Sequence, residues 1–162
     1  MLSSDKLGDF ISELRTYNSS FVSSELVPQA NSLERINHLL DYIKRDTPLN
    51  KESVGLSDRQ VRYYVHASKI LGLIDEDVHL TTLGRLVLLS DGDEKKRALK
   101  LAIEKSEFGK AWIAWSGMST IEEIDPETAA EFLRQRSPDL SSRVTLSRRA
   151  STIRRWLKTL NT

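Results

Sequence analysis

Apolar residues recur three and four positions apart along most of the chain, which predicts a mainly α-helical protein. The clearest stripe runs from Leu33 to Ile43, and Asn31 or Ser32 precedes it as a helix cap. Similar spacing predicts further helices over residues 5–16, 82–89, 98–103 and 108–115, one starting at Asp125-Pro126, and a last one from about Leu146 to Leu160. Almost no β structure is therefore expected.

Residues 51–80 carry the local signals of a winged helix. A possible short helix over 51–54 ends at Gly55, and Ser57 with Gln60 forms a capping box at the start of a helix that Gly72 ends. Two short apolar runs, 73–74 and 78–80, flank a polar turn and predict a very short β-hairpin. Helix, short helix, turn, helix and hairpin is the winged-helix order, in which the helix before the hairpin enters the major groove. The alternative is a helical domain with one surface hairpin.

The same signals divide the chain into three parts. Residues 1–30 are expected to form an N-terminal helix and loop, and residues 31–90 the winged-helix subdomain. Residues 91–162 are expected to form a second helical, helix-turn-helix-like subdomain that ends in a basic helix. Trp112 and Trp115 lie three apart on one helix face, so we expect them in the core that joins the two halves.

Charge is distributed unevenly along the chain, although the formal net charge is only +1. Residues 132–162 carry eight lysines and arginines against the single acid Asp139, and no acid follows Leu140. On a helical wheel the basic residues of the last helix lie opposite its apolar stripe. A solvated helix face usually mixes acids with lysines, so this face favours contact with a polyanion. The candidate DNA contacts here are Arg143, Arg148, Ser151, Thr152, Arg154, Arg155 and Lys158.

The helix that follows Ser57 is the other candidate for DNA contact. Its predicted contacts are Arg59, Gln60, Arg62, Tyr63 and His66. The tip of the hairpin, residues 75–77, is however entirely acidic and would be repelled by phosphate. A packing or dimer role therefore stays open for this half.

The sequence lacks the residue patterns of an enzyme or of a metal site. It has no cysteine, and its three histidines lie on separate predicted elements without a second ligand at metal spacing. No glycine-rich phosphate loop or nucleophile elbow is present. We therefore expect no catalysis, no metal and no cofactor. Without a signal-peptide pattern or an apolar run of about 20 residues, a cytoplasmic protein with no membrane contact is expected.

Residues 57–84, with Ser57-Asp58-Arg59-Gln60-Val61-Arg62-Tyr63-Tyr64 and Leu80-Thr81-Thr82-Leu83-Gly84, resemble a bacterial winged helix. Together with the tail 146–157, they are similar to the winged-helix domains of type II restriction endonucleases and related restriction-modification proteins, over roughly residues 32–160. The resemblance implies a target-recognition module for double-stranded DNA, with cleavage by a separate nuclease domain or subunit. A regulator, or a protein-interaction module that forms a homodimer, is the alternative.

Overall fold

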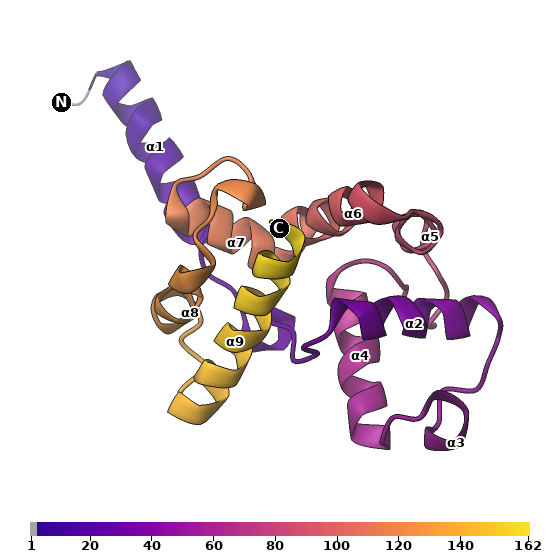
Figure 1. Ribbon diagram of the computed structural model, residues 1–162. Helices are drawn as coiled ribbons and strands as arrows, with labels where there is room; N and C mark the ends of the chain where they lie inside the picture. The colour runs from indigo at the N-terminus through magenta and orange to yellow at the C-terminus, as the bar shows by residue number, and fades with distance from the viewer. Residues whose placement is uncertain (1–2) are drawn as a thin grey trace.

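The computed structural model describes residues 3–162 and is mainly helical (Figure 1). The first half contains α1 (Ser4–Ser19), η1 (Ser24–Leu26), α2 (Leu33–Lys44), α3 (Lys51–Val54), α4 (Asp58–Ile70) and α5 (Thr82–Leu89). The second half contains α6 (Gly92–Lys105), α7 (Glu107–Ser116), η2 (Ile121–Glu123), η3 (Pro126–Thr128), α8 (Ala129–Arg136) and α9 (Arg143–Leu160). The helices predicted from apolar spacing are confirmed.

Local capping explains where several helices begin. The Ser57 hydroxyl accepts from the backbone N–H of Gln60, and the Gln60 side chain accepts from the backbone N–H of Ser57, so the predicted capping box starts α4. Helix α9 begins at Arg143 rather than at Leu146, because the Ser142 side chain accepts from the N–H of Thr145. The prediction from apolar spacing placed this start too late.

The predicted hairpin is reduced to a single antiparallel bridge between Ile74 and Leu80, and residues 3–162 contain no strand. All five residues between these partners form the turn, so none is left to extend the pairing. The carboxylate of Asp75 closes the turn by accepting from the backbone N–H groups of Asp77 and His79. Val78 adopts a left-handed φ of 62° there, which further shortens any ladder.

One hydrophobic core runs through both halves of the molecule. Its buried members extend from Leu33 and Ile36 in α2 to Ile153 and Leu157 in α9. Helix α6 packs against α5, α7 and α9 and so connects the two halves. The rings of Trp112 and Phe132 stack at 5.7 Å, which confirms the core position of Trp112. The subdomains 31–90 and 91–162 therefore share a core.

Gly84 in α5 lies against the chain that precedes the turn. A Cβ atom at this position would come within 2.0 Å of the carbonyl oxygen of Leu73. Glycine is thus required for the close approach of α5 to residue 73. The Thr81 hydroxyl, which donates to the Gly72 carbonyl, fixes the same junction.

Residues 20–32, which we call the strap, cross between the two halves and connect α1 to α2 (Figure 1). The N–H of Val22 donates to the Arg136 carbonyl, and the Trp156 indole donates to the Ala30 carbonyl at 2.9 Å. At its far end the N–H of Ser32 donates to the hydroxyl of Tyr64 in α4. The strap therefore holds α4 and α9 in a fixed relation.

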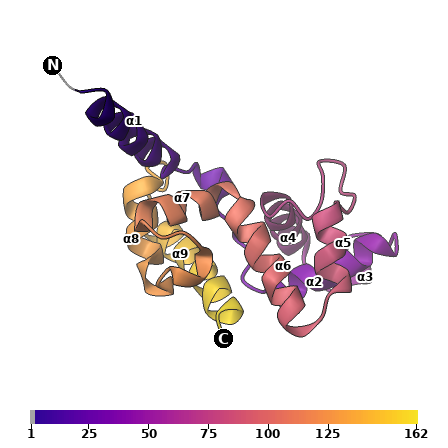
Figure 2. The same ribbon diagram turned by 90° about the horizontal axis from the view of Figure 1, so that it is seen from above.

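Helix α1 projects away from the rest of the molecule in both ribbon views (Figures 1 and 2). It contains no buried residue, and the Tyr17 and Phe21 rings beneath Arg136 mark the place where it joins the body. None of the described helices has both the length and the apolar character needed to cross a membrane.

Candidate nucleic-acid interface

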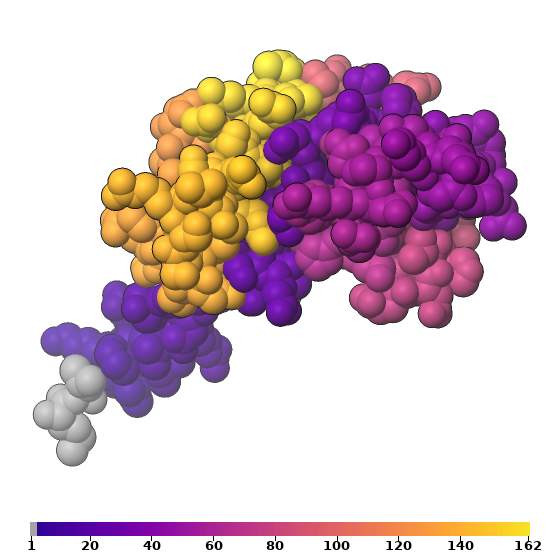
Figure 3. Space-filling view, turned by 90° about the horizontal axis from the view of Figure 1, so that it is seen from below, coloured from indigo at the N-terminus to yellow at the C-terminus, as the bar shows by residue number. Residues whose placement is uncertain are grey.

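A polar groove of about 370 Å³ lies between α4 and α9, with the strap as its floor. The space-filling view shows α4 (magenta) and α9 (orange to yellow) side by side, with indigo strap residues between them (Figure 3). Nine residues line the groove: Gln29, Asn31, Arg59, Tyr63, Thr145, Arg148, Arg149, Ser151 and Thr152. Three of them are arginines and none is an acid. The groove is therefore a concentration of positive charge.

Helix α4 supplies Arg59 and Tyr63, which lie one turn apart near its N-terminal end. The Arg59 Nε donates to the Tyr63 hydroxyl at 2.7 Å, and the guanidinium carbon lies 5.3 Å from the centre of the ring. Among residues 3–162 the terminal N–H groups of this arginine have no acceptor, so they can bind a ligand. The pair forms a flat, positively charged wall of the groove.

Helix α9 supplies the opposite wall, with Arg148 and Ser151 facing the groove. Across residues 3–162, neither Arg59 nor Arg148 forms an ion pair with a carboxylate. Arg59, Tyr63, Arg148 and Ser151 were predicted on two separate helices, and the structure brings them together. Two candidate surfaces thus become one site.

Arg149 is a member of the groove that the helical wheel did not select. Its side chain is half-buried, and Nη1 donates to the carbonyls of Ser24 at 2.6 Å and Val27 at 2.8 Å. Burial lowers the pKa of this guanidinium below its ordinary value, while Tyr63 and Asp139 act in the opposite direction. Arg149 still carries its charge at neutral pH and is held in place by the strap.

Thr152 also lines the groove, but its predicted role as a direct DNA contact is wrong for this conformation. The residue is only 2% exposed, and its hydroxyl donates to the Asn31 side-chain oxygen at 2.6 Å. A buried hydroxyl with this partner positions Asn31 rather than reaching a large ligand. The wheel placed Thr152 near the basic face because it could not include the strap.

The basic face of α9 is not free of acids in space, although no acid follows Leu140 in the sequence. Glu127 of η3 approaches from the side, with Lys158 Nζ at 2.5 Å and Arg154 Nη1 at 3.5 Å from its oxygens. The Lys158 ammonium is the main cause of the lowered pKa of this carboxyl. Arg154 and Lys158, which were predicted to contact DNA, are therefore already paired with a carboxylate in this structure.

The remaining predicted contacts lie outside the groove. Gln60 is committed to the capping box by its oxygen, and the His66 Nε2 donates to the Glu25 carbonyl at 2.7 Å. Arg62 and Arg155 are exposed, and Arg143 lines a separate shallow hollow beside Arg154. These side chains do not converge on one ligand.

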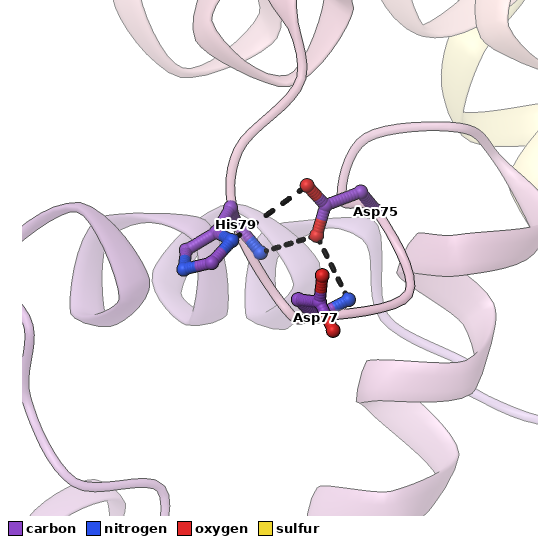
Figure 4. A group of neighbouring side chains, drawn as sticks. All are labelled: Asp75, Asp77 and His79. Atoms are coloured by element: carbon purple, nitrogen blue, oxygen red, sulfur yellow. Dashed lines mark hydrogen bonds and ion pairs between the residues drawn. The ribbon is translucent and has the colours of Figure 1, made fainter.

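A second group of polar side chains lies at the turn of the bridge (Figure 4). The side chains of Asp75, Asp77 and His79 offer ligand atoms within 4.8 Å of one another, so His79 does have neighbouring carboxylates, contrary to the prediction. All three residues are exposed, and Asp75 already accepts two backbone N–H groups. The hydrogen bond from the His79 backbone is the main cause of the lowered pKa of Asp75. We assign the group to closure of the turn.

A comparison with protein families gives one match. The model of a family described as "Domain of unknown function (DUF7226)" matches residues 35–161, which include both walls of the groove. No curated protein and no solved structure matches the chain.

Proposed function

The chain belongs to the DUF7226 family, and we propose that it is a sequence-specific binding module for double-stranded DNA. One observation carries the proposal: Arg59, Arg148 and Arg149 converge from distant parts of the sequence on a groove without acids. Arginine guanidinium groups bind phosphate oxygens through two parallel hydrogen bonds. The phosphate backbone supplies most of the affinity in protein–DNA complexes, so such a cluster suits this ligand.

In this proposal the two helices have different tasks. Arg148 of α9 and Arg59 of α4 neutralise phosphates on the two rims of the groove. The N-terminal end of α4 also reads base edges through the exposed Arg62, as the equivalent helix does in winged-helix proteins. The helix order α2, α3, α4 before the bridged turn supports this assignment. Target recognition for a separate nuclease, or regulation, are the two settings in which such a module would serve.

The experiment measures binding to a duplex selected from a random pool, by fluorescence anisotropy over a salt series. We expect the double variant Arg59→Ala, Arg148→Ala to lower the slope of log affinity against log salt by about two, one for each lost phosphate contact. Both side chains are exposed, so the fold stays intact. The control Arg154→Ala, Lys158→Ala removes the same charge but affects cations that already pair with Glu127.

Comparison of the two double variants shows whether DNA binding depends on the groove or only on the net positive charge of the protein. Equal losses in the two double variants would assign binding to net charge and contradict the groove. Failure of the wild-type chain to bind any duplex at low salt would overturn the proposal as a whole.

A second candidate function, self-association, is favoured by α1. The polar side of this helix, with Asp9, Ser12 and Thr16, lines a hollow against Trp115 of the body. Its apolar stripe is exposed, with Leu7 at 48%, Phe10 at 55% and Leu14 at 47%. In most amphipathic helices the apolar side faces the core and the polar side faces solvent, so the orientation of α1 is reversed.

A second copy of the chain is the occupant that fits this stripe. Leu7 and Tyr17, like Phe10 and Leu14, are equally distant from residue 12, so two antiparallel α1 helices align these pairs in both directions. Asp5, Asp9 and Glu13 outnumber the two basic residues of α1, which disfavours DNA and anionic lipid as partners. We therefore propose an antiparallel dimer through α1.

A further inference from the structure

Arg149 is a half-buried cation without a directly paired carboxylate, and only the more distant Asp139 offsets part of its charge. Its partners are the Ser24 and Val27 carbonyls, and it forms no ion pair within residues 3–162. Burying a charge without an opposite charge costs free energy, and a bound anion removes that cost. Since the strap holds the guanidinium beside Arg148, both can face one anionic group. The chemistry of these two arginines therefore suits a phosphate group.

The size of the groove limits what that phosphate can carry. A duplex is far too wide to enter a hollow of about 370 Å³, so a paired helix touches only the rims. The volume is near the lower end for small-ligand sites and suits one nucleotide. A nucleotide reaches such a hollow only when it is unpaired or turned out of the stack.

The other lining residues have the chemistry that recognises an unpaired base. The stacked Arg59 and Tyr63 side chains provide a planar wall, and both guanidinium groups and aromatic rings stack on bases. Gln29 is half-buried in the groove, and its side chain forms no hydrogen bond within the described residues. The amide of Asn31 keeps both its N–H donors, since only its oxygen is engaged by Thr152. Two amides can therefore meet the edge of a base.

We infer that the groove between α4 and α9 takes a single unpaired nucleotide, with its phosphate on Arg148 and Arg149 and its base between the Arg59–Tyr63 wall and the amides of Gln29 and Asn31. This inference rests on the proposed DNA binding and adds the feature of DNA that the module selects. In this arrangement the duplex lies across the two rims of the groove, and the nucleotide that is no longer paired in the duplex enters the groove.

The test compares two DNA dumbbells whose ends are closed by non-nucleotide linkers. Their paired stems have the same sequence, and the second carries one extra, unpaired nucleotide in the middle of its stem. We expect the full chain to bind the second roughly tenfold more tightly, from one stacked and hydrogen-bonded base. The variant Gln29→Ala should lose most of this preference, because the groove then has one amide fewer to meet the base. Gln29→Glu, which keeps the size of the side chain but places a negative charge beside the phosphate, should abolish it.

The control Gln135→Ala removes the same side chain from a site outside the groove, where Gln135 bonds to Trp115 and Glu131. It should keep the tenfold preference. Equal binding of the two dumbbells by the wild-type chain would overturn the inference and leave the duplex proposal standing. A preference that survives both Gln29 variants would also overturn it. Binding to neither dumbbell would reject both proposals.

Discussion

Asp139 has a larger role than an exposed carboxylate usually has. Its oxygens accept from the backbone N–H of Ser24 at 3.0 Å and from the Ser24 hydroxyl at 2.7 Å, and so fix the strap to the loop between α8 and α9. The hydrogen bond from the Ser24 side chain is the main cause of a lowered pKa at Asp139. Since the Ser24 carbonyl also holds Arg149, this acid supports the floor of the groove.

We expect Asp139→Asn to lower the free energy of unfolding by about 1 kcal/mol at neutral pH, because the amide accepts fewer of the Ser24 donors. A group with a lowered pKa stabilises the fold above its ordinary value of 3.8 and loses that effect as the pH falls through the folded value. The difference between wild type and variant should therefore shrink below about pH 3.8. Urea unfolding followed by circular dichroism over a pH series measures it.

Asp77→Asn is the matched control, because the Asp77 carboxylate accepts no hydrogen bond within residues 3–162. A difference between wild type and Asp139→Asn that grows in acid would contradict the assigned role of Asp139.

Individual residues show what a linear pattern can and cannot predict. Arg148 and Arg59 were identified because each lies on the polar side of a helix whose period is visible in the sequence. Gln29 and Asn31 were missed, since the strap has no period and becomes part of the site only by crossing between α4 and α9. Glu127 was missed as a partner for the same reason: it meets Lys158 across 31 positions of sequence.

Among the helices, α1 is predicted to form a dimer through its exposed apolar stripe. We expect the wild-type chain to sediment as a dimer at tens of micromolar, and Phe10→Ser, Leu14→Ser to sediment as a monomer. Helix content should fall little, because neither side chain is buried in the monomer. Sedimentation equilibrium measures the mass and circular dichroism the helix content.

The control Asp5→Ser, Asp9→Ser changes the polar side of the same helix and should stay dimeric. A wild-type chain that is monomeric throughout this range would contradict the antiparallel dimer and leave the groove unaffected.

Helices were easier to predict than the other elements because a helix repeats its pattern over many residues. Both strong caps, Ser57 and Ser32, lie where the sequence places them. The prediction of a hairpin at residues 73–80 was wrong. Five residues form the turn between Ile74 and Leu80, and the apolar runs on either side are too short to add further strand pairs to this bridge. For α1 the sequence predicted the apolar stripe correctly. The stripe alone does not show whether it packs against the rest of the same chain or is exposed to solvent, as it is in the structure.

The whole molecule is predicted to unfold as one cooperative unit. The core is continuous across both halves, and the strap bonds to α4 and α9. All three tryptophans, Trp112, Trp115 and Trp156, lie in the second half, whereas far-ultraviolet circular dichroism reports helices in both. We expect the two signals to change at the same urea concentration, and Asp139→Asn to shift both together. Two separate midpoints would show that residues 31–90 and 91–162 unfold independently.

The strap has a consequence for the timing of synthesis. The walls of the groove come from α4 and α9, and its floor comes from residues near 29–31, so its parts leave the ribosome at very different moments. A nascent chain can fold α2 to α5 early, but Arg148 and Arg149 emerge only with α9. The arginine cluster therefore does not exist on the growing chain. If the groove binds DNA as proposed, binding through it can begin only after α9 has been made and has docked on the strap, so an unfinished chain would not occupy DNA.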